Sequence, residues 1–183
     1  MKQIFNQDDY NSNDGMLTSI WGPAQWHVLH TMSFNYPEFP NKQEKKYYLN
    51  YILSLQHVLP CGKCRKNFIN NLKKYPLTMK HMETRDTFSR YLFNLHEIIN
   101  TMLGKKSGLT FEIVRERYEH FRARCSSSFT KSVIKENGCI QPLYGEKSKC
   151  IIQIVPQTKK CKTFQIDKKC LKTRKHFPSL NKT

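Results

Sequence analysis

The sequence predicts an all-α protein: a four-helix bundle with a short fifth helix, followed by a lysine- and cysteine-rich C-terminal tail. Apolar residues recur at helical spacing in several segments between residues 20 and 125. No strand pair or β-hairpin pattern is found before residue 130. The composition changes after Cys125, where lysines become frequent. We therefore expect a flexible arm at 1–19, a helical domain at 20–125 and a basic tail at 126–183.

The first helix is expected over about Trp21–Asn35, with Pro23 in its first turn, where a missing backbone N–H is tolerated. Tyr36–Pro37 ends it, because the residue before a proline avoids the helical region. Trp26 and His30 are four residues apart and share one face.

The second helix is expected to open at Asn41, since Glu44 three residues later completes a capping box. Its buried stripe is predicted at Tyr48, Ile52, Leu55 and Leu59. A third helix then starts with Pro60 in its first turn and runs to about Leu72.

The fourth helix, about Thr84–Leu103, has the clearest apolar period of the chain, and Gly104 suits the position after its end. Its apolar face is predicted to contain Phe88, Tyr91, Leu92, Leu95, Ile99, Met102 and Leu103. His96 and Asn100 lie on the flank of that face. The fifth helix is expected from the cap Thr110 to about Arg124.

The charge of the chain is strongly positive but uneven. The net charge is +17, which favours a nucleic-acid partner, yet residues 126–183 carry 13 basic and 3 acidic residues, a net of +10. The excess therefore lies in the tail, which supports an alternative function as a basic nucleic-acid- or virion-binding helical protein with a structural C-x-x-C. The start, Met1–Gly15, has no apolar segment typical of a signal peptide, and no run of about 18 apolar residues predicts a membrane span. We expect a cytoplasmic protein.

The pair Cys61 and Cys64 is the strongest chemical motif. At the start of a helix, and next to Lys63, Arg65 and Lys66, a thiolate is favoured, as in dithiols that exchange electrons. A structural zinc site would need a second ligand pair at short spacing, which the sequence lacks, so no metal is expected. A thioredoxin-like domain would need strands around the motif. The redox interpretation is favoured over these two alternatives.

Four blocks in a fixed order resemble the FAD-linked sulfhydryl oxidases of the Erv/ALR family over about residues 20–125. That family has a G-R/P-x-x-W-x-x-x-H opening, then Tyr-Pro, C-x-x-C and H-N-x-V-N-x-x-L-G-K. This chain has Gly22-Pro23-Ala24-Gln25-Trp26-His27-Val28-Leu29-His30, Tyr36-Pro37, Cys61-Gly62-Lys63-Cys64 and His96-Glu97-Ile98-Ile99-Asn100-Thr101-Met102-Leu103-Gly104-Lys105. The resemblance, with a composition typical of AT-rich genomes, suggests a member from a large DNA virus, located in the host cytoplasm or the virion.

The resemblance implies an enzyme that binds FAD, oxidises protein thiols to disulfides and reduces O₂ to H₂O₂. A thioredoxin-like carrier would be the substrate, and a homodimer is implied. Cys61 would be attacked by the incoming thiolate, and Cys64 would lie beside the flavin. From the first helix, the FAD site would be lined by Gly22, Trp26, His30 and Tyr36.

By the same resemblance, His96, Asn100 and Lys105 would hold the adenosine and phosphate side, and Phe121–Arg122 would lie near the adenine. Two departures stand out. Glu97 replaces the asparagine that usually follows the histidine, and no cysteine follows Lys105 where the family's structural disulfide begins. That bridge is lost or rerouted from Cys125 to the tail. The pairing of the tail cysteines, Cys139, Cys150, Cys161 and Cys170, stays open.

Overall fold

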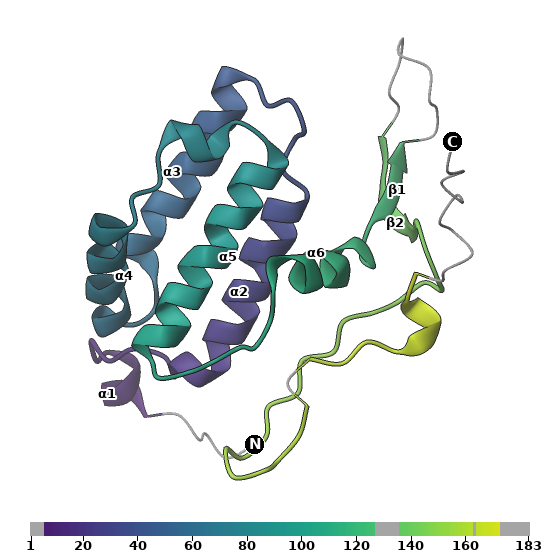
Figure 1. The fold of residues 1–183 in the computed structure, drawn as a ribbon. Coiled ribbons are helices and arrows are strands. Elements are labelled where there is room, and N and C mark those ends of the chain that lie inside the picture. The colour runs from purple at the N-terminus through teal and green to yellow at the C-terminus, as the bar shows by residue number, and fades with distance from the viewer. Residues whose placement is uncertain (1–5, 127–135, 163, 173–183) are drawn as a thin grey trace, which may run out of the picture. The chain divides into compact units, whose positions relative to one another are not determined.

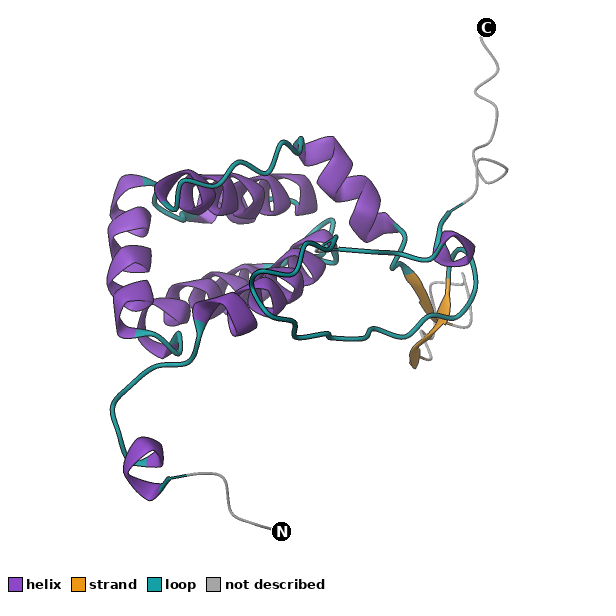
Figure 2. Ribbon diagram, turned by 90° about the horizontal axis from the view of Figure 1, so that it is seen from below, coloured by secondary structure: helices purple, strands orange, loops and turns teal. Residues whose placement is uncertain are grey.

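The computed structural model describes residues 6–126, 136–162 and 164–172. The chain divides into two compact units, Met1–Leu109 and Thr110–Thr183, and each is described by itself. The first unit is helical (Figures 1 and 2). Its elements are α1 (Gln7–Tyr10), α2 (Thr18–Phe34), α3 (Lys42–Val58), α4 (Gly62–Lys74), the 3₁₀ helix η1 (Met79–Met82) and α5 (Arg85–Met102).

Local capping fixes the helix ends that the sequence predicted best. The Asn41 side chain accepts from the backbone N–H of Gln43 and Glu44, and the Glu44 carboxylate accepts from the Asn41 N–H, which completes the capping box. Thr84 caps α5. Gly104 follows α5 with a φ of 68°, the left-handed conformation that glycine adopts at helix ends.

The start of α2 differs from the expectation. The helix begins at Thr18, so Pro23 lies inside it and not in its first turn. An added N-terminal turn is stabilised because the backbone N–H groups of Ile20 and Trp21 both donate to the Leu17 carbonyl. The arm before it was expected to be flexible, but α1 and a backbone hydrogen bond from Met16 to Pro60 give it structure.

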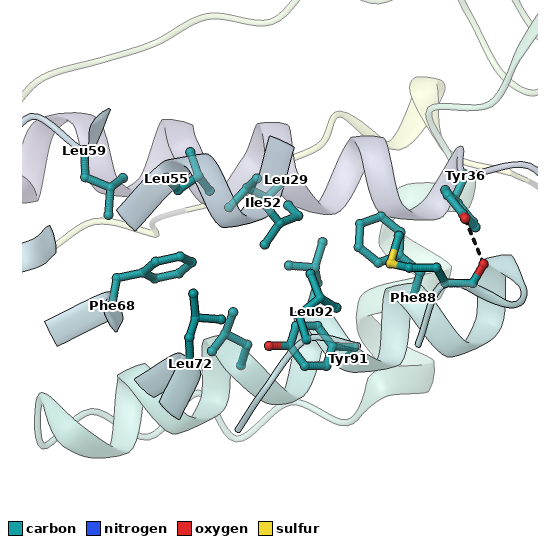
Figure 3. Packing of buried hydrophobic residues seen from close by; sticks show 13 residues of the cluster. Leu29, Tyr36, Ile52, Leu55, Leu59, Phe68, Leu72, Phe88, Tyr91 and Leu92 are labelled. Carbon is teal, nitrogen blue, oxygen red and sulfur yellow. Dashed lines mark hydrogen bonds between the residues drawn. The ribbon is translucent and has the colours of Figure 1, made fainter. Parts of the chain in front are cut away.

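One apolar core lies between α2, α3, α4, α5 and η1 (Figure 3). Its buried members are Leu29, Tyr36, Ile52, Leu55, Leu59, Phe68, Leu72, Leu77, Met82, Phe88, Tyr91, Leu92 and Leu95. The predicted stripe of α3 is confirmed for Ile52, Leu55 and Leu59. The predicted apolar face of α5 is not buried at its C-terminal end, where Met102 and Leu103 are 45% and 52% exposed.

The second unit contains α6 (Phe111–Glu119), β1 (Ala123–Ser126), β2 (Glu136–Pro142) and the 3₁₀ helix η2 (Lys168–Cys170). The strands β1 and β2 pair antiparallel, and a disulfide joins Cys125 on β1 to Cys139 on β2. Two expectations were therefore wrong: the fifth helix ends at Glu119 and not near Arg124, and a strand begins before residue 130. The backbone partners of β1 lie beyond the intervening residues 127–135, so no local pattern marks the strand.

The mostly helical fold class is confirmed. The expected domain boundary at residue 125 stays a prediction, although the first compact unit already ends at Leu109. Within the described residues, no helix is both long and apolar enough to cross a membrane.

Candidate functional site

The two cysteines of the C-x-x-C motif form a disulfide at the start of α4. Cys61 is the N-cap residue, and its Sγ accepts from the Cys64 backbone N–H at 3.2 Å. Pro60 was expected in the first helical turn, but it precedes the cap because α4 begins at Gly62. The expectation that both cysteines lie at a helix N-terminus is confirmed.

The surroundings of this disulfide favour negative charge on sulfur. The N-terminal end of α4 carries partial positive charge from its unpaired N–H groups. Arg65 reaches back over the turn, where its Nη1 donates to the Leu59 carbonyl at 2.5 Å, and the basic side chains of Lys63 and Lys66 belong to the same first turns. When the disulfide is reduced, these groups stabilise a thiolate over a thiol.

Residues 15–18, which lead into α2, pack against the turn that carries the disulfide. The Met16 N–H donates to the Pro60 carbonyl at 2.9 Å, and Trp21 Nε1 donates back to the Met16 carbonyl at 3.0 Å. Thr18 Oγ1 lies 3.5 Å from Cys64 Sγ. Gly15 approaches closely, since a Cβ there would lie 2.8 Å from the Pro60 carbonyl oxygen.

A second cluster, of aromatic and imidazole rings, joins α2 to α5. The Trp26 ring stacks on His96, with centroids 3.8 Å apart and planes 6° from parallel. His30 Nε2 and His96 Nδ1 share a hydrogen bond of 3.0 Å, in which the tautomers decide which ring donates. Residues predicted from the first and the fourth expected helix are thus brought together.

The two histidines of this cluster are held neutral. Burial, together with the neighbouring His96 and His27, lowers the pKa of His30 from its ordinary value of 6.5 to about 3. Burial also lowers the pKa of His96, to about 4, although the Glu97 carboxylate opposes this. Neutral rings offer both a donor and an acceptor nitrogen, and stack without bringing charge into the site.

The end of α5 is organised by Glu97. One carboxylate oxygen accepts from Asn100 Nδ2 and the other from Ser107 Oγ, each at 2.9 Å. The Lys105 backbone N–H donates to the Asn100 carbonyl at 2.8 Å. Glu97, which departs from the family pattern, therefore orients the Asn100 side chain and ties the segment after α5 back to the helix.

The remaining predicted residues lie in different surroundings. Gly22 lies in α2, where a Cβ would meet Thr18 Cγ2 at an ordinary 3.6 Å, so the chain itself does not require glycine there. Tyr36 is fully buried, and its hydroxyl donates to the Met82 carbonyl at 2.8 Å. Phe121 and Arg122 belong to the second unit, where Arg122 pairs with Glu119. The cofactor roles given to these residues stay predictions.

Helix α2 links the disulfide and the ring cluster. Thr18, its first residue, contacts Cys64, and Trp26 follows eight residues later. At a rise of 1.5 Å per residue, the two positions are separated by roughly 12 Å along the helix axis.

These features define a helical protein with a C-x-x-C disulfide at a helix start and a stacked tryptophan–histidine cluster on the helix beside it. The chain belongs to the Erv1 / Alr family, whose sequence model matches residues 23–119.

Named relatives come from viruses and plants, among others. The chain is 36% identical over 86 residues to the "Probable FAD-linked sulfhydryl oxidase R368" of Acanthamoeba polyphaga mimivirus, covering 47% of this chain and 60% of that protein. It is 35% identical to the "FAD-linked sulfhydryl oxidase" of African swine fever virus (isolate Pig/Kenya/KEN-50/1950), covering 70% of that protein.

The fold is similar to that of a solved member of the family. The yeast Erv1 core superposes with a TM-score of 0.51 at 23% identity, over 57% of this chain and 86% of that one. The alignment with the mimivirus relative leaves about 40% of that protein unmatched. Family and fold are thereby fixed for the helical part of the chain.

Sequence reasoning missed Gly15, Met16 and Thr18 because they fell in the segment expected to be flexible. Their contacts are with residues more than 40 positions away. Trp21, an aromatic residue that follows the turn-forming residues 11–15, was the one local sign that this segment is ordered.

Proposed function

We propose that this chain is an FAD-linked sulfhydryl oxidase that introduces disulfide bonds into protein substrates. The proposal depends above all on the C-x-x-C disulfide at the start of α4, held against the same helix that carries the tryptophan–histidine cluster. Membership of the Erv1 / Alr family supports it, since viral and plant relatives carry that name.

The residues present fit an FAD. Trp26 and His96 offer a flat stacked face for an adenine, and His30 fixes the His96 ring through a hydrogen bond. Gly22 stays a proposed cofactor contact on the resemblance alone. We propose that Asn100, whose amide is oriented by Glu97, and the exposed Lys105 hold the polar and phosphate groups. When bound, FAD accepts two electrons from a dithiol and passes them to O₂.

The chain itself performs the thiol exchange. A substrate thiolate attacks Cys61 Sγ, the Cys61–Cys64 bond breaks, and its electron pair goes to Cys64 Sγ. A second substrate thiolate then displaces Cys61, which leaves as a thiolate stabilised by the Cys64 N–H and the start of α4. The substrate is released with a new disulfide, and both cysteines are left reduced.

The overall reaction is 2 R–SH + O₂ → R–S–S–R + H₂O₂. Protein thiols, presented by a thioredoxin-like carrier, are the proposed substrates, and a homodimer is the proposed assembly. Tyr36, Phe121 and Arg122 remain proposed cofactor contacts on the resemblance alone.

Purified full-length protein tests the proposal. It should be yellow, release FAD on denaturation, and generate H₂O₂ with dithiothreitol as substrate. Cys64→Ser should keep the flavin and lose the activity, whereas Ser54→Ala, an exposed position on α3, should change neither. Colourless protein that stays inactive after incubation with FAD would refute the assignment.

The basic C-terminal segment supports a second, compatible role in binding nucleic acid. Residues 136–162 and 164–172 contain eight lysines, at 147, 149, 159, 160, 162, 168, 169 and 172, against three acidic residues, Glu136, Glu146 and Asp167. Phosphate contacts by lysine make duplex binding fall steeply with salt. Duplex DNA titrated at 50 and 200 mM salt should show this loss, and salt-independent or undetectable binding would exclude the role.

A further inference from the structure

We infer that Thr18 is a positioning residue for the redox disulfide: its hydroxyl stabilises the Cys64 thiolate and thereby directs opening of the bond toward Cys64. This inference rests on the proposed thiol oxidation, because it concerns the sulfur released when a substrate thiolate attacks Cys61. It also makes the first turn of α2 part of the redox site.

The direction of the contact follows from the chemistry of the disulfide. Thr18 Oγ1 lies 3.5 Å from Cys64 Sγ, and a sulfur in a disulfide carries no hydrogen. The hydroxyl is therefore the donor. A neutral disulfide sulfur is a weak acceptor, whereas a thiolate is a charged one, so the same contact strengthens when the bond opens.

Two hydrogen bonds of Met16 and the close packing of Gly15 hold the backbone before Thr18 in place. The Met16 N–H is bonded to Pro60, one residue before Cys61, and the Met16 carbonyl accepts from Trp21 Nε1. Gly15 packs so closely on Pro60 and Cys61 that any side chain would displace the segment. Because Thr18 is the first residue of α2, its hydroxyl is carried by a helix that is anchored on the disulfide turn.

The two sulfurs have different hydrogen-bond donors, and this difference lets Thr18 favour negative charge on Cys64. Cys61 is the N-cap residue and receives the Cys64 N–H, so the helix start alone would favour the Cys61 thiolate. Thr18 adds a donor to Cys64 only. When a substrate thiolate bonds to Cys61 Sγ, the electron pair of the broken bond goes to Cys64 Sγ, and the Thr18 hydroxyl stabilises that charge.

The test measures the Cys64 thiol without relying on catalysis. In full-length protein carrying Cys61→Ser, the rate of Cys64 alkylation by iodoacetamide is followed against pH, with the Cys64 peptide quantified by mass spectrometry. Thr18→Val keeps the shape of the side chain and removes its hydroxyl. It should raise the pKa of Cys64 by about one unit, which lowers the thiolate fraction at neutral pH about tenfold. Thr18→Ser should restore most of the effect. Thr31→Val, also on α2 but bonded to His27, should leave the pKa unchanged.

A second measurement covers variants that fold poorly with Cys61→Ser. In the otherwise unmutated chain, Thr18→Val should shift the glutathione equilibrium of the Cys61–Cys64 pair several-fold toward the disulfide, because the reduced form loses stabilisation. Gly15→Ala, which keeps the hydroxyl but disturbs its support, should shift it in the same direction. An equilibrium and a pKa unchanged by Thr18→Val would overturn the inference, as would a failure of Thr18→Ser to restore them.

The outcomes separate this inference from the proposed function. Protein without flavin or oxidase activity in which Thr18→Val still shifts the thiol chemistry would refute the oxidase and keep the role of Thr18. An active flavoprotein in which the Thr18 variants match the unmutated chain would refute the role of Thr18 and keep the oxidase.

Discussion

Replacing Glu97 with alanine tests how the end of α5 is held. The substitution removes two hydrogen bonds to the carboxylate, from Asn100 Nδ2 and Ser107 Oγ. Hydrogen bonds to charged groups contribute roughly 1.5–3 kcal/mol when well buried. Here Ser107 is exposed and Glu97 and Asn100 are half-buried, so water can replace part of that contribution. We expect Glu97→Ala to lower the free energy of unfolding by about 1.5 kcal/mol.

Urea unfolding followed by tryptophan fluorescence measures this loss, because both tryptophans, Trp21 and Trp26, lie in the first unit. With a slope of about 2 kcal/mol per molar urea, the midpoint should fall by roughly 0.7 M. Glu97→Gln keeps one acceptor oxygen and should lose about half as much. Glu83→Ala removes a carboxylate from an exposed position and controls for the change of net charge.

A double-mutant cycle separates the direct contact from a general effect of the helix end. Ser107→Ala alone should cost about 0.5–1 kcal/mol, and it should cost clearly less when Glu97 is already alanine, because only the bond that Ser107 Oγ accepts from the Leu109 N–H then remains to be lost. Losses that simply add in the double variant would show that the two side chains do not act through each other. The segment after α5 would then be held by contacts other than the bond between Glu97 and Ser107.

Two further predictions concern Tyr36 and the histidine pair. Tyr36→Phe leaves the buried Met82 carbonyl without its partner and should lower the free energy of unfolding by about 1–2 kcal/mol. If the variant keeps its flavin, Tyr36 belongs to the core alone. If the variant loses flavin, the result supports the proposed cofactor contact. Burial holds the pKa of His30 near 3 and that of His96 near 4, so between pH 6.5 and these values the unfolded chain takes up protons that the folded chain does not. Urea unfolding should therefore show the free energy of unfolding falling by about 1 kcal/mol per histidine from pH 7 to pH 5.5. A His96→Gln variant that keeps the full pH dependence would contradict this. His57→Gln, at an exposed position, is the control.

Features encoded within one or two helical turns could be predicted from the sequence. The Asn41 capping box, the buried stripe from Ile52 to Leu59 and the position of both cysteines at a helix N-terminus all depend on neighbouring residues, although Pro60 was wrongly expected inside that helix. The order of the family blocks also identified Trp26, His30 and His96, which the structure brings together. Local pattern and motif order were sufficient for these.

Features that depend on distant partners could not be predicted. The extra turn of α2 before Pro23 is stabilised where the preceding segment bonds to Pro60, and no pattern within that segment reveals a partner 44 residues away. Glu97 was visible only as a departure from the family pattern, because its partner Ser107 lies across the helix end. Strand β1 likewise depends on β2, from which residues 127–135 separate it.

The anchoring of α2 on the disulfide turn has an optical consequence. Trp21, in the first turn of α2, donates to the Met16 carbonyl, and the Met16 N–H is bonded to Pro60 beside Cys61, whereas Trp26 stacks on His96. The only two indoles of the chain therefore fall one in each half of the proposed site. With Trp26 changed to phenylalanine, the emission reports on the surroundings of the cysteines. With Trp21 changed instead, it reports on the ring stack, so light from one natural fluorophore at a time can follow each half.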